Sequence, residues 1–160
     1  ERSCAMRWLV NFLATGGGAG YLLWAPGTAG SCVGLLIGCL TASYAAPLRA
    51  GLLVMALLIG VAVSTSAERA AGAHDPSFVV IDEVWGMWAV IAAFPSLLQA
   101  PGMMALAFVL FRLFDIVKPP PLKWFAKAPA GWGIMLDDVG AAAYTILVLR
   151  LVLVLNHSIT

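Results

Sequence analysis

A chain of 160 residues is long enough for one domain. Only 11% of its residues are charged and 62% are hydrophobic, whereas a soluble domain carries about 25% charged and roughly 45–50% apolar residues. This excludes an ordinary water-soluble surface and predicts a chain that is embedded in a membrane. The net charge of +1, without a basic run, gives no reason to expect nucleic acid as a partner.

Glycine and proline divide the hydrophobic sequence into predicted helices. Residues 8–24 are apolar but contain glycines at 16–18, which predicts a short span or a re-entrant segment. A turn at 25–28 precedes a helix that Pro47 is expected to end. The predicted helices after that turn occupy residues 31–46, 48–72, 78–94, 102–115 and 134–155, with a short amphipathic piece at 122–127. The sequence therefore predicts one domain over 1–160, an all-α integral membrane helical bundle. Several of its spans are shorter than the roughly 17–25 residues that cross a bilayer.

Six of the eight acidic residues lie within or beside these apolar helices, at positions 75, 82, 83, 115, 137 and 138. An aspartate at the centre of a membrane helix costs about 2.5–3.5 kcal/mol, so such residues are seldom without a role. If the helices alternate across a bilayer, the polar segments 25–31, 75–83, 112–118 and 135–138 end at one face. Basic residues are more frequent at this face, which predicts that it lies in the cytoplasm: Arg69, Arg112, Lys118, Lys123 and Lys127.

Carboxylates that meet in one place repel each other unless a cation lies among them. Oxygen ligands suit Mg²⁺ or Mn²⁺, and the sequence offers no Cys/His set for zinc. Arg112 and Lys118 could hold a phosphate beside such a metal, although Arg112 and Asp115 could also form a simple i,i+3 salt bridge. The small turn at 27–31 could direct N–H groups and hydroxyls at an anion. Together these features favour metal-assisted hydrolysis of a phosphate ester.

Two other functions use similar residues. A small ion- or proton-coupled transporter would also contain intramembrane carboxylates paired with arginine, but here the charges gather at one face and no repeated halves are visible. A lipid-synthesising transferase of the CDP-alcohol type would use a metal with aspartates. Its spaced DG…AR…G…D…D pattern is absent, because Asp137 and Asp138 are adjacent and no Asp-Gly pair exists.

Four segments carry a resemblance to a known family. They are APGTAGS at 25–31, DP at 75–76 followed by VIDEVWGMW at 80–88, FRLFDIVKP at 111–119, and GIMLDDV at 133–139. In this order they are similar to the motifs of the phosphatidylglycerophosphatase A family. Two departures, Trp24 and Ala141, lie at positions with no expected chemical role.

The resemblance implies a Mg²⁺-dependent, multi-pass enzyme of the bacterial inner membrane, with its site facing the cytoplasm. Its phospholipid substrate would be phosphatidylglycerophosphate, whose terminal phosphate is removed to give phosphatidylglycerol. The expected catalytic residues are Asp82, Glu83, Asp115, Asp137 and Asp138. All of these except Asp137 are also expected metal ligands, and the expected ligands of the substrate phosphate are Thr28, Ser31, Arg112 and Lys118.

Overall fold

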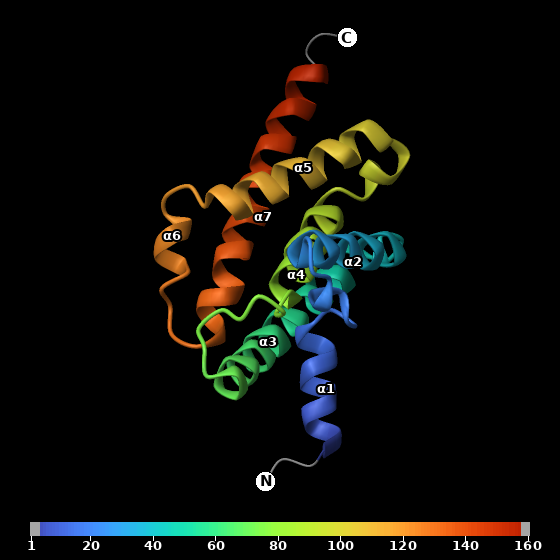
Figure 1. Cartoon of the computed structure of the whole chain (residues 1–160). Helices are drawn as coiled ribbons and strands as arrows, with labels where there is room; N and C mark the ends of the chain where they lie inside the picture. Colours follow the sequence, from blue (N-terminus) through green and yellow to red (C-terminus); the bar gives the residue numbers. More distant parts are fainter. Residues whose placement is uncertain (1–3, 158–160) are drawn as a thin grey trace.

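A computed structural model of the chain describes residues 4–157, and every regular element in that range is helical (Figure 1). The prediction of an all-α fold is therefore confirmed. In chain order the elements are α1 (Cys4–Ala14), η1 (Ala19–Tyr21), α2 (Pro26–Thr41), α3 (Ala46–Ala71), α4 (Ile81–Ala93), η2 (Pro95–Gln99), α5 (Pro101–Val117), α6 (Leu122–Phe125) and α7 (Gly131–His157).

The element boundaries differ from the prediction at two prolines. The expected turn at 25–28 is already helical, because α2 begins at Pro26. Pro47 does not end a helix but stands in the first turn of α3. A proline is tolerated there, since the N–H that it lacks would have no partner within the helix. Residues 8–24 do not form one continuous helix, because α1 ends at Ala14 and a turn with positive φ at three successive glycines, 16–18, follows. The choice between a short span and a re-entrant segment stays a prediction.

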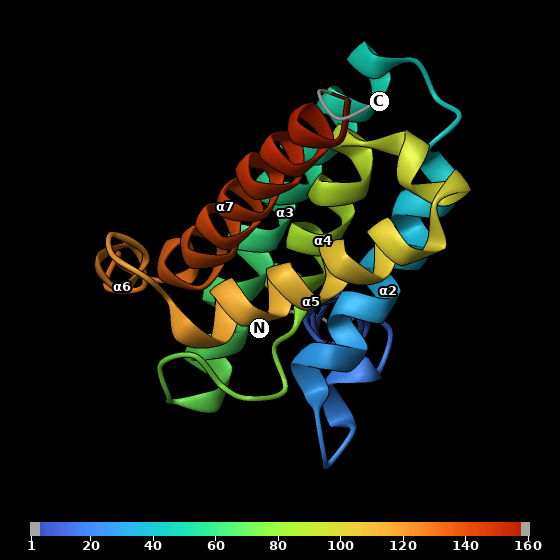
Figure 2. The same ribbon diagram turned by 90° about the horizontal axis from the view of Figure 1, so that it is seen from above.

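Helix α4 lies at the centre of the bundle, and α2, α3, α5 and α7 all contact it (Figure 2). Nine of its 13 residues are buried, including Asp82 in its first turn. The starts of α2, α4 and α7 and the ends of α3 and α5 lie in the lower half of Figure 2. This arrangement brings polar residues from distant parts of the sequence to one end of the bundle.

A row of glycines lets α2 approach α4 closely. Gly30, Gly34 and Gly38 are buried on α2, and a Cβ atom added to any of them would overlap α4 or the residue before it. At Gly34 the added atom would lie 3.0 Å from Val84 Cα and closer still to its carbonyl oxygen. Small residues at this spacing are a common device for close helix packing in membranes. The row therefore fixes where the first turn of α4 lies against α2.

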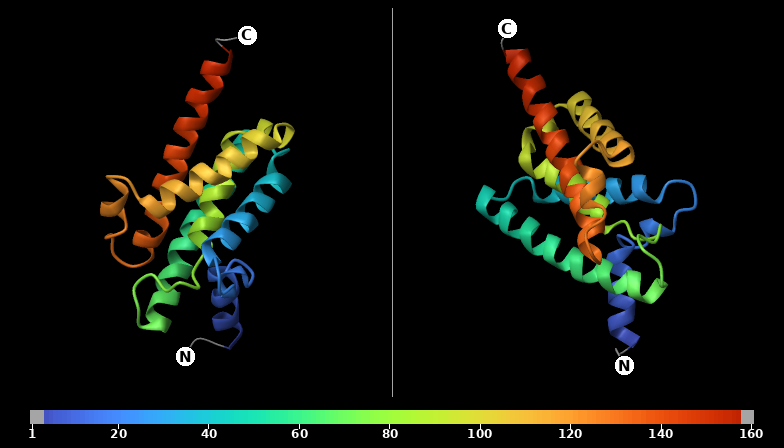
Figure 3. Two further views of the ribbon diagram at one scale, coloured as in Figure 1. Left: turned by 45° about the horizontal axis from the view of Figure 1, so that its top comes forward. Right: turned by 90° about the vertical axis from the view of Figure 1, so that its left-hand side faces the viewer.

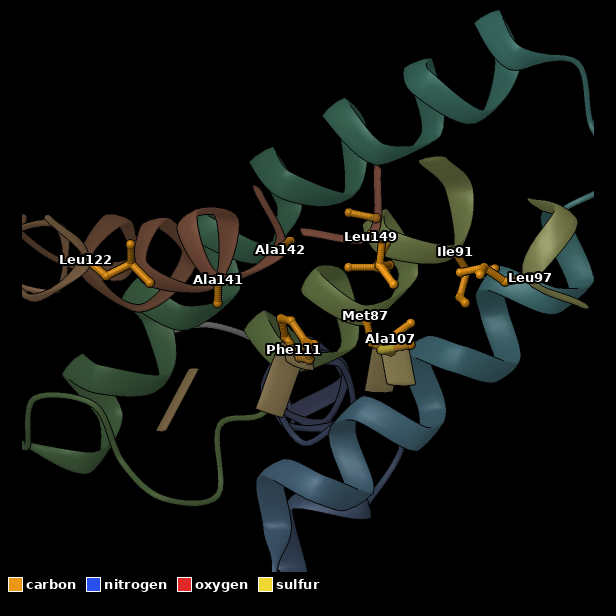
Figure 4. Close-up of a cluster of buried hydrophobic side chains, with 11 residues drawn as sticks. Met87, Ile91, Leu97, Ala107, Phe111, Leu122, Ala141, Ala142 and Leu149 are labelled. Atoms are coloured by element: carbon orange, nitrogen blue, oxygen red, sulfur yellow. The ribbon is translucent and has the colours of Figure 1, made fainter. Parts of the chain in front are cut away.

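The main hydrophobic core fills the space between α4, α5 and α7. Figure 4 shows Met87, Ala107 and Phe111 gathered between α4 and α5, with Leu149 on α7 nearby. Phe111 is fully buried and directly precedes Arg112 in sequence. The packing of Phe111 therefore orients the end of α5 that carries the polar residues.

Two helices, α3 and α7, are long and apolar enough to cross a membrane (Figure 3). In the most apolar stretch of α3 only 11% of the residues are buried within the protein, and in that of α7 only 28%. The core helix of a soluble protein would be mostly buried instead. Large apolar side chains such as Leu58 and Leu151 are more than half exposed. The outer surface is thus compatible with a membrane helical bundle.

The close contact at Gly34 can be tested with two matched substitutions. Gly34→Ala should lower the free energy of unfolding by about 1–3 kcal/mol, because α2 and α4 must separate to admit the methyl group. Gly51→Ala on α3 is the control, since a Cβ atom there meets nothing within 4 Å, and it should be neutral or stabilise by up to about 1 kcal/mol. Thermal unfolding in detergent, followed by circular dichroism, measures both. Equal midpoints for the two variants would contradict the packing described here.

Candidate active site

Three carboxylates meet at the polar end of the bundle. Asp82 and Glu83 come from the first turn of α4, and Asp138 comes from the second turn of α7. Each offers one carboxylate oxygen, and these three oxygens lie within 4.8 Å of one another. We call Asp82, Glu83 and Asp138 the carboxylate cluster.

The carboxylate cluster is largely shielded from solvent, and part of its hydrogen-bonding capacity is unused. Asp138 is 1% exposed and Asp82 is 9% exposed. One oxygen of each member, Asp82 Oδ1, Glu83 Oε2 and Asp138 Oδ2, has no hydrogen-bond partner among the described residues. Buried polar atoms are normally paired, and neighbouring buried carboxylates repel each other. Carboxylate oxygens within 4.8 Å of one another, on residues that keep unpaired oxygens, fit a hard divalent cation.

Arg112 on α5 joins three elements at the edge of the carboxylate cluster. Its Nη1 atom lies 2.6 Å from Asp115 Oδ2 and 3.8 Å from Glu83 Oε1. The same atom donates to the Ser31 hydroxyl on α2 at 3.4 Å. Asp115 therefore lies next to the cluster and forms an ion pair with Arg112, which is the i,i+3 salt bridge expected as an alternative from the sequence. A guanidinium with several donors can retain such partners and still bind a phosphate oxygen.

Lys118 and Asp137 form a second charged pair beside the cluster, since Asp137 directly precedes Asp138 in sequence. Lys118 follows the last residue of α5 and has a left-handed backbone, with φ of 46°. Burial alone would lower the pKa of Lys118, but its hydrogen bond to Asp137 and the nearby carboxylates raise this pKa to about 12. Asp137 Oδ1 also accepts the backbone N–H of Asp138 at 3.1 Å. Asp137 is thus placed to support Asp138 and to hold Lys118 in its cationic form.

The first turn of α2 lies directly against these groups. A Cβ atom at Gly27 would lie 2.9 Å from Arg112 Nη1 and would overlap the Glu83 carboxylate. Ser31 is fully buried and donates to the Gly27 carbonyl at 2.9 Å. Thr28 is exposed and makes no hydrogen bond to the cluster among the described residues. Of the two hydroxyls expected to bind phosphate, the structure brings Ser31 to Arg112 and leaves Thr28 at the surface.

Comparison with known proteins places the chain in a family. The model of the phosphatidylglycerophosphatase A family matches residues 12–153. Phosphatidylglycerophosphatase A of Haemophilus influenzae is 39% identical over 142 residues, which cover 87% of this chain and 85% of the relative. This chain belongs to the phosphatidylglycerophosphatase A family.

Two further relatives match most of this chain. Phosphatidylglycerophosphatase A of Escherichia coli is 33% identical over 82% of this chain and 76% of its own length. A Bacteroides thetaiotaomicron protein, named provisionally as a phosphatidylinositol-3-phosphatase, is 34% identical over 88% of this chain and 91% of its own length. No solved structure matches the chain significantly. The resemblance seen in the four motifs is confirmed, and members of the phosphatidylglycerophosphatase A family are named as phosphatase enzymes.

The four motifs of this phosphatidylglycerophosphatase A family member do not contribute equally to the site. Asp75 lies outside the carboxylate cluster, where its backbone N–H donates to Glu68 at 3.1 Å. Gly27 was expected only as part of a flexible turn and Gly86 was given no role, yet both lie where helices come close together. A Cβ atom at Gly86 would lie within 2.6 Å of the Phe111 ring. Both glycines stand inside the family motifs, which is the signal that could have indicated close approach of the backbone.

A divalent cation should stabilise the folded protein if the carboxylate cluster binds it. At a cation concentration about 100 times the dissociation constant, the free energy of unfolding should rise by about 2.7 kcal/mol. Asp138→Asn should abolish this increase, because it removes a charge and a ligand oxygen from the cluster. Asp75→Asn is the control, since Asp75 is exposed and outside the cluster. Thermal unfolding with and without a chelator measures the effect. An unchanged cation effect in Asp138→Asn would contradict the site.

Proposed function

We propose that this protein hydrolyses the terminal phosphate of phosphatidylglycerophosphate and releases phosphatidylglycerol and inorganic phosphate. The observation that carries the proposal is the carboxylate cluster with two cationic side chains beside it: Arg112, 3.8 Å from Glu83, and Lys118, paired with Asp137. Negative groups suit a metal and positive groups suit a phosphate, so a phosphate monoester can be held between them. The names of the relatives from Haemophilus influenzae and Escherichia coli support this substrate.

Mg²⁺ is the proposed cofactor, held by Asp82, Glu83 and Asp138. All of the proposed ligands are oxygen atoms, and Mg²⁺ is commonly bound through a few carboxylates together with substrate phosphate and water. Asp115 is the proposed fourth ligand, because it interacts electrostatically with Asp138 and stands beside Arg112. When bound, the cation supplies Lewis-acid polarisation of the phosphate ester and makes an attacking water more acidic.

The residues of the chain then have separate roles. Arg112 and Lys118 bind the terminal phosphate and neutralise charge as the ester bond breaks. Ser31 orients Arg112, and Thr28 with the first turn of α2 offers further donors to the phosphate, as a helix N-terminus can. A carboxylate of the site accepts the proton of the attacking water, and Asp115 and Asp137 stand beside the cluster for this role. Asp115 is paired with Arg112 and Asp137 with Lys118, so each carboxylate is held in place beside the cluster.

We further propose that the protein is a multi-pass protein of the bacterial inner membrane whose site faces the cytoplasm. The exposed apolar surfaces of α3 and α7 support insertion in lipid. Basic residues are more frequent at the end of the bundle with the site than at the other end, where Arg49 and Arg150 lie. This is the distribution expected for a cytoplasmic face.

A transporter is supported less well by the same geometry. The acidic residues of the site and their cationic partners lie at one end of the bundle, and the buried ion pairs connect α2, α4, α5 and α7 there. A proton or ion pathway would need polar groups along the whole depth of the bundle. Beyond the site, the core of α4 and α7 is formed by apolar side chains such as Ile91 and Leu149.

Phosphate release is the direct test of the proposed activity. The purified protein in detergent should release phosphate from phosphatidylglycerophosphate with Mg²⁺ and not with a chelator. Asp138→Asn should reduce kcat/KM by about 100-fold or more, because it weakens metal binding and charge stabilisation together. Phosphatidylinositol 3-phosphate, assayed in parallel, tests the activity that the name of the Bacteroides relative suggests.

Each result of this assay has a separate meaning. Asp75→Asn is the matched control and should retain wild-type activity. Faster hydrolysis of phosphatidylinositol 3-phosphate would replace the proposed substrate but leave the phosphate-monoester chemistry intact. A folded protein that releases phosphate from neither lipid would overturn the proposal and direct attention to ion flux in vesicles.

The role of the Arg112 guanidinium group can be separated from the effect of its positive charge. Arg112→Lys retains one positive charge but loses the guanidinium, whose Nη1 atom contacts Ser31, Glu83 and Asp115 and whose further N–H groups can bind a phosphate. We expect kcat/KM to fall by about 10- to 100-fold, since lysine binds phosphate only as a point charge. Lys123→Arg, outside the ion pairs of the site, should have no effect. Steady-state kinetics measures both variants. Full activity in Arg112→Lys would show that a point charge suffices and would exclude a specific role of the guanidinium in binding phosphate.

A further inference from the structure

A cleft between α1 and α3 carries positive charge and lies apart from the carboxylate cluster. It has a volume of about 500 Å³ and is lined by Arg7, Val10, Asn11, Ser66, Arg69 and Ala70. Helices α1 and α3 pack against each other at this point (Figure 3). None of these residues belongs to the proposed site, and none of them is acidic. The proposed phosphatase reaction makes no use of this cleft.

The two arginines of the cleft have no ion-pair partner among residues 4–157. Arg7 comes from α1 and Arg69 comes from the last turn of α3, so two separate helices bring positive charge to one hollow. Asn11 and Ser66 line the same cleft and add uncharged polar groups. Two guanidinium groups facing a shared space are suited to a phosphate, whose oxygens accept several hydrogen bonds at once.

An aromatic wall adjoins this cationic cleft. Trp8 and Phe12 stack with ring centroids 5.2 Å apart, and their side chains are largely exposed. Together with Tyr21 they line a second cavity of about 240 Å³, and Asn11 lines both cavities. A cationic hollow that continues into an aromatic surface matches a molecule with an anionic head and an apolar tail.

The position along α3 agrees with such a ligand. Most of α3 presents apolar side chains outward, and Arg69 stands three residues before Gly72, which ends the helix with a left-handed backbone. Arginine and tryptophan at the end of an apolar helix are typical of the headgroup layer of a bilayer. The cleft therefore lies at the depth where lipid phosphates are found, provided that α3 spans the membrane as proposed above.

We propose that the cleft between α1 and α3 binds an anionic glycerophospholipid, with its headgroup phosphate on Arg7 and Arg69 and its acyl chains along Trp8 and Phe12. The bound lipid is a structural ligand and not the substrate, because no residue of the carboxylate cluster lines the cleft. It attaches the amphipathic helix α1 to the bundle and to the surrounding bilayer.

Native mass spectrometry in a neutral detergent tests this site with phosphatidylserine as the probe. Phosphatidylserine is anionic but is neither the proposed substrate nor its product. Binding at the active site therefore does not add to the number of bound phosphatidylserine molecules. The wild-type protein should retain one more bound molecule of phosphatidylserine than of phosphatidylcholine. In the double variant Arg7→Gln/Arg69→Gln, binding should weaken by about 30-fold, or roughly fivefold for each arginine.

A matched control removes the same charge elsewhere. Lys123→Gln/Lys127→Gln lowers the net charge equally, at the same end of the bundle but outside the cleft. This variant should bind phosphatidylserine as the wild type does. Equal weakening in both double variants would mean diffuse attraction and would overturn the proposal, as would unchanged binding in Arg7→Gln/Arg69→Gln. If that variant does not fold, Arg69→Gln alone should still weaken binding about fivefold.

Two further measurements separate this proposal from its alternatives. An excess of inorganic phosphate should not displace the lipid; displacement would mean that the cleft takes free phosphate and would overturn the lipid assignment. Phosphate release from phosphatidylglycerophosphate should be unchanged in Arg7→Gln/Arg69→Gln. Loss of lipid binding with retained activity supports the cleft, whereas absence of activity in the wild type would count only against the proposed reaction.

Discussion

The repulsion among three buried carboxylates is the constraint on which the rest of this structure depends. Asp82, Glu83 and Asp138 come within 4.8 Å of one another in a bundle that is otherwise apolar. Removing one such charge from water already costs several kcal/mol, and like charges at close range add to that cost. The protein places cationic groups at the margin of the cluster, where Arg112 pairs with Asp115 and Lys118 pairs with Asp137. A chain that only needed stability would have buried apolar residues at these positions.

Close helix packing makes this arrangement of charges possible. The carboxylates occupy the first turn of α4 and the second turn of α7, so small displacements of either helix would change the spacing of the oxygens. Gly34 and its neighbours hold α2 against α4, and Gly86 admits the Phe111 ring between α4 and α5. Phe111 in turn sets the position of Arg112. The backbone contacts and the charged contacts therefore depend on each other, and the glycines of the motifs serve the site without touching a ligand.

Much of the site could be predicted from sequence because the membrane-like composition makes each charge informative. In a chain with 11% charged residues, acidic side chains within apolar helices stand out, and counting helices suffices to expect Glu83, Arg112 and Asp138 at one end. Helix boundaries were harder to predict. A proline such as Pro26 or Pro47 indicates a helix boundary in the sequence, but it can end one helix or begin the next. Tertiary packing decides between the two. The surface position of Thr28 depends on the rotation of α2 about its axis, which is fixed by the glycine row and is not evident from a four-residue turn.

The length of α4 has a consequence for how a lipid would reach the site. Its 13 residues extend about 20 Å, whereas the hydrocarbon core of a bilayer is about 30 Å thick. A central helix this short cannot hold the carboxylates at the surface of an undistorted bilayer while its other end reaches the opposite surface. The polar end of the bundle is then recessed, or the lipid around it is thinned. If the protein lies in a membrane and acts on a lipid as proposed, a phosphorylated headgroup would descend a short distance while its acyl chains remain in their own leaflet. Turnover would then be sensitive to the thickness of the host membrane.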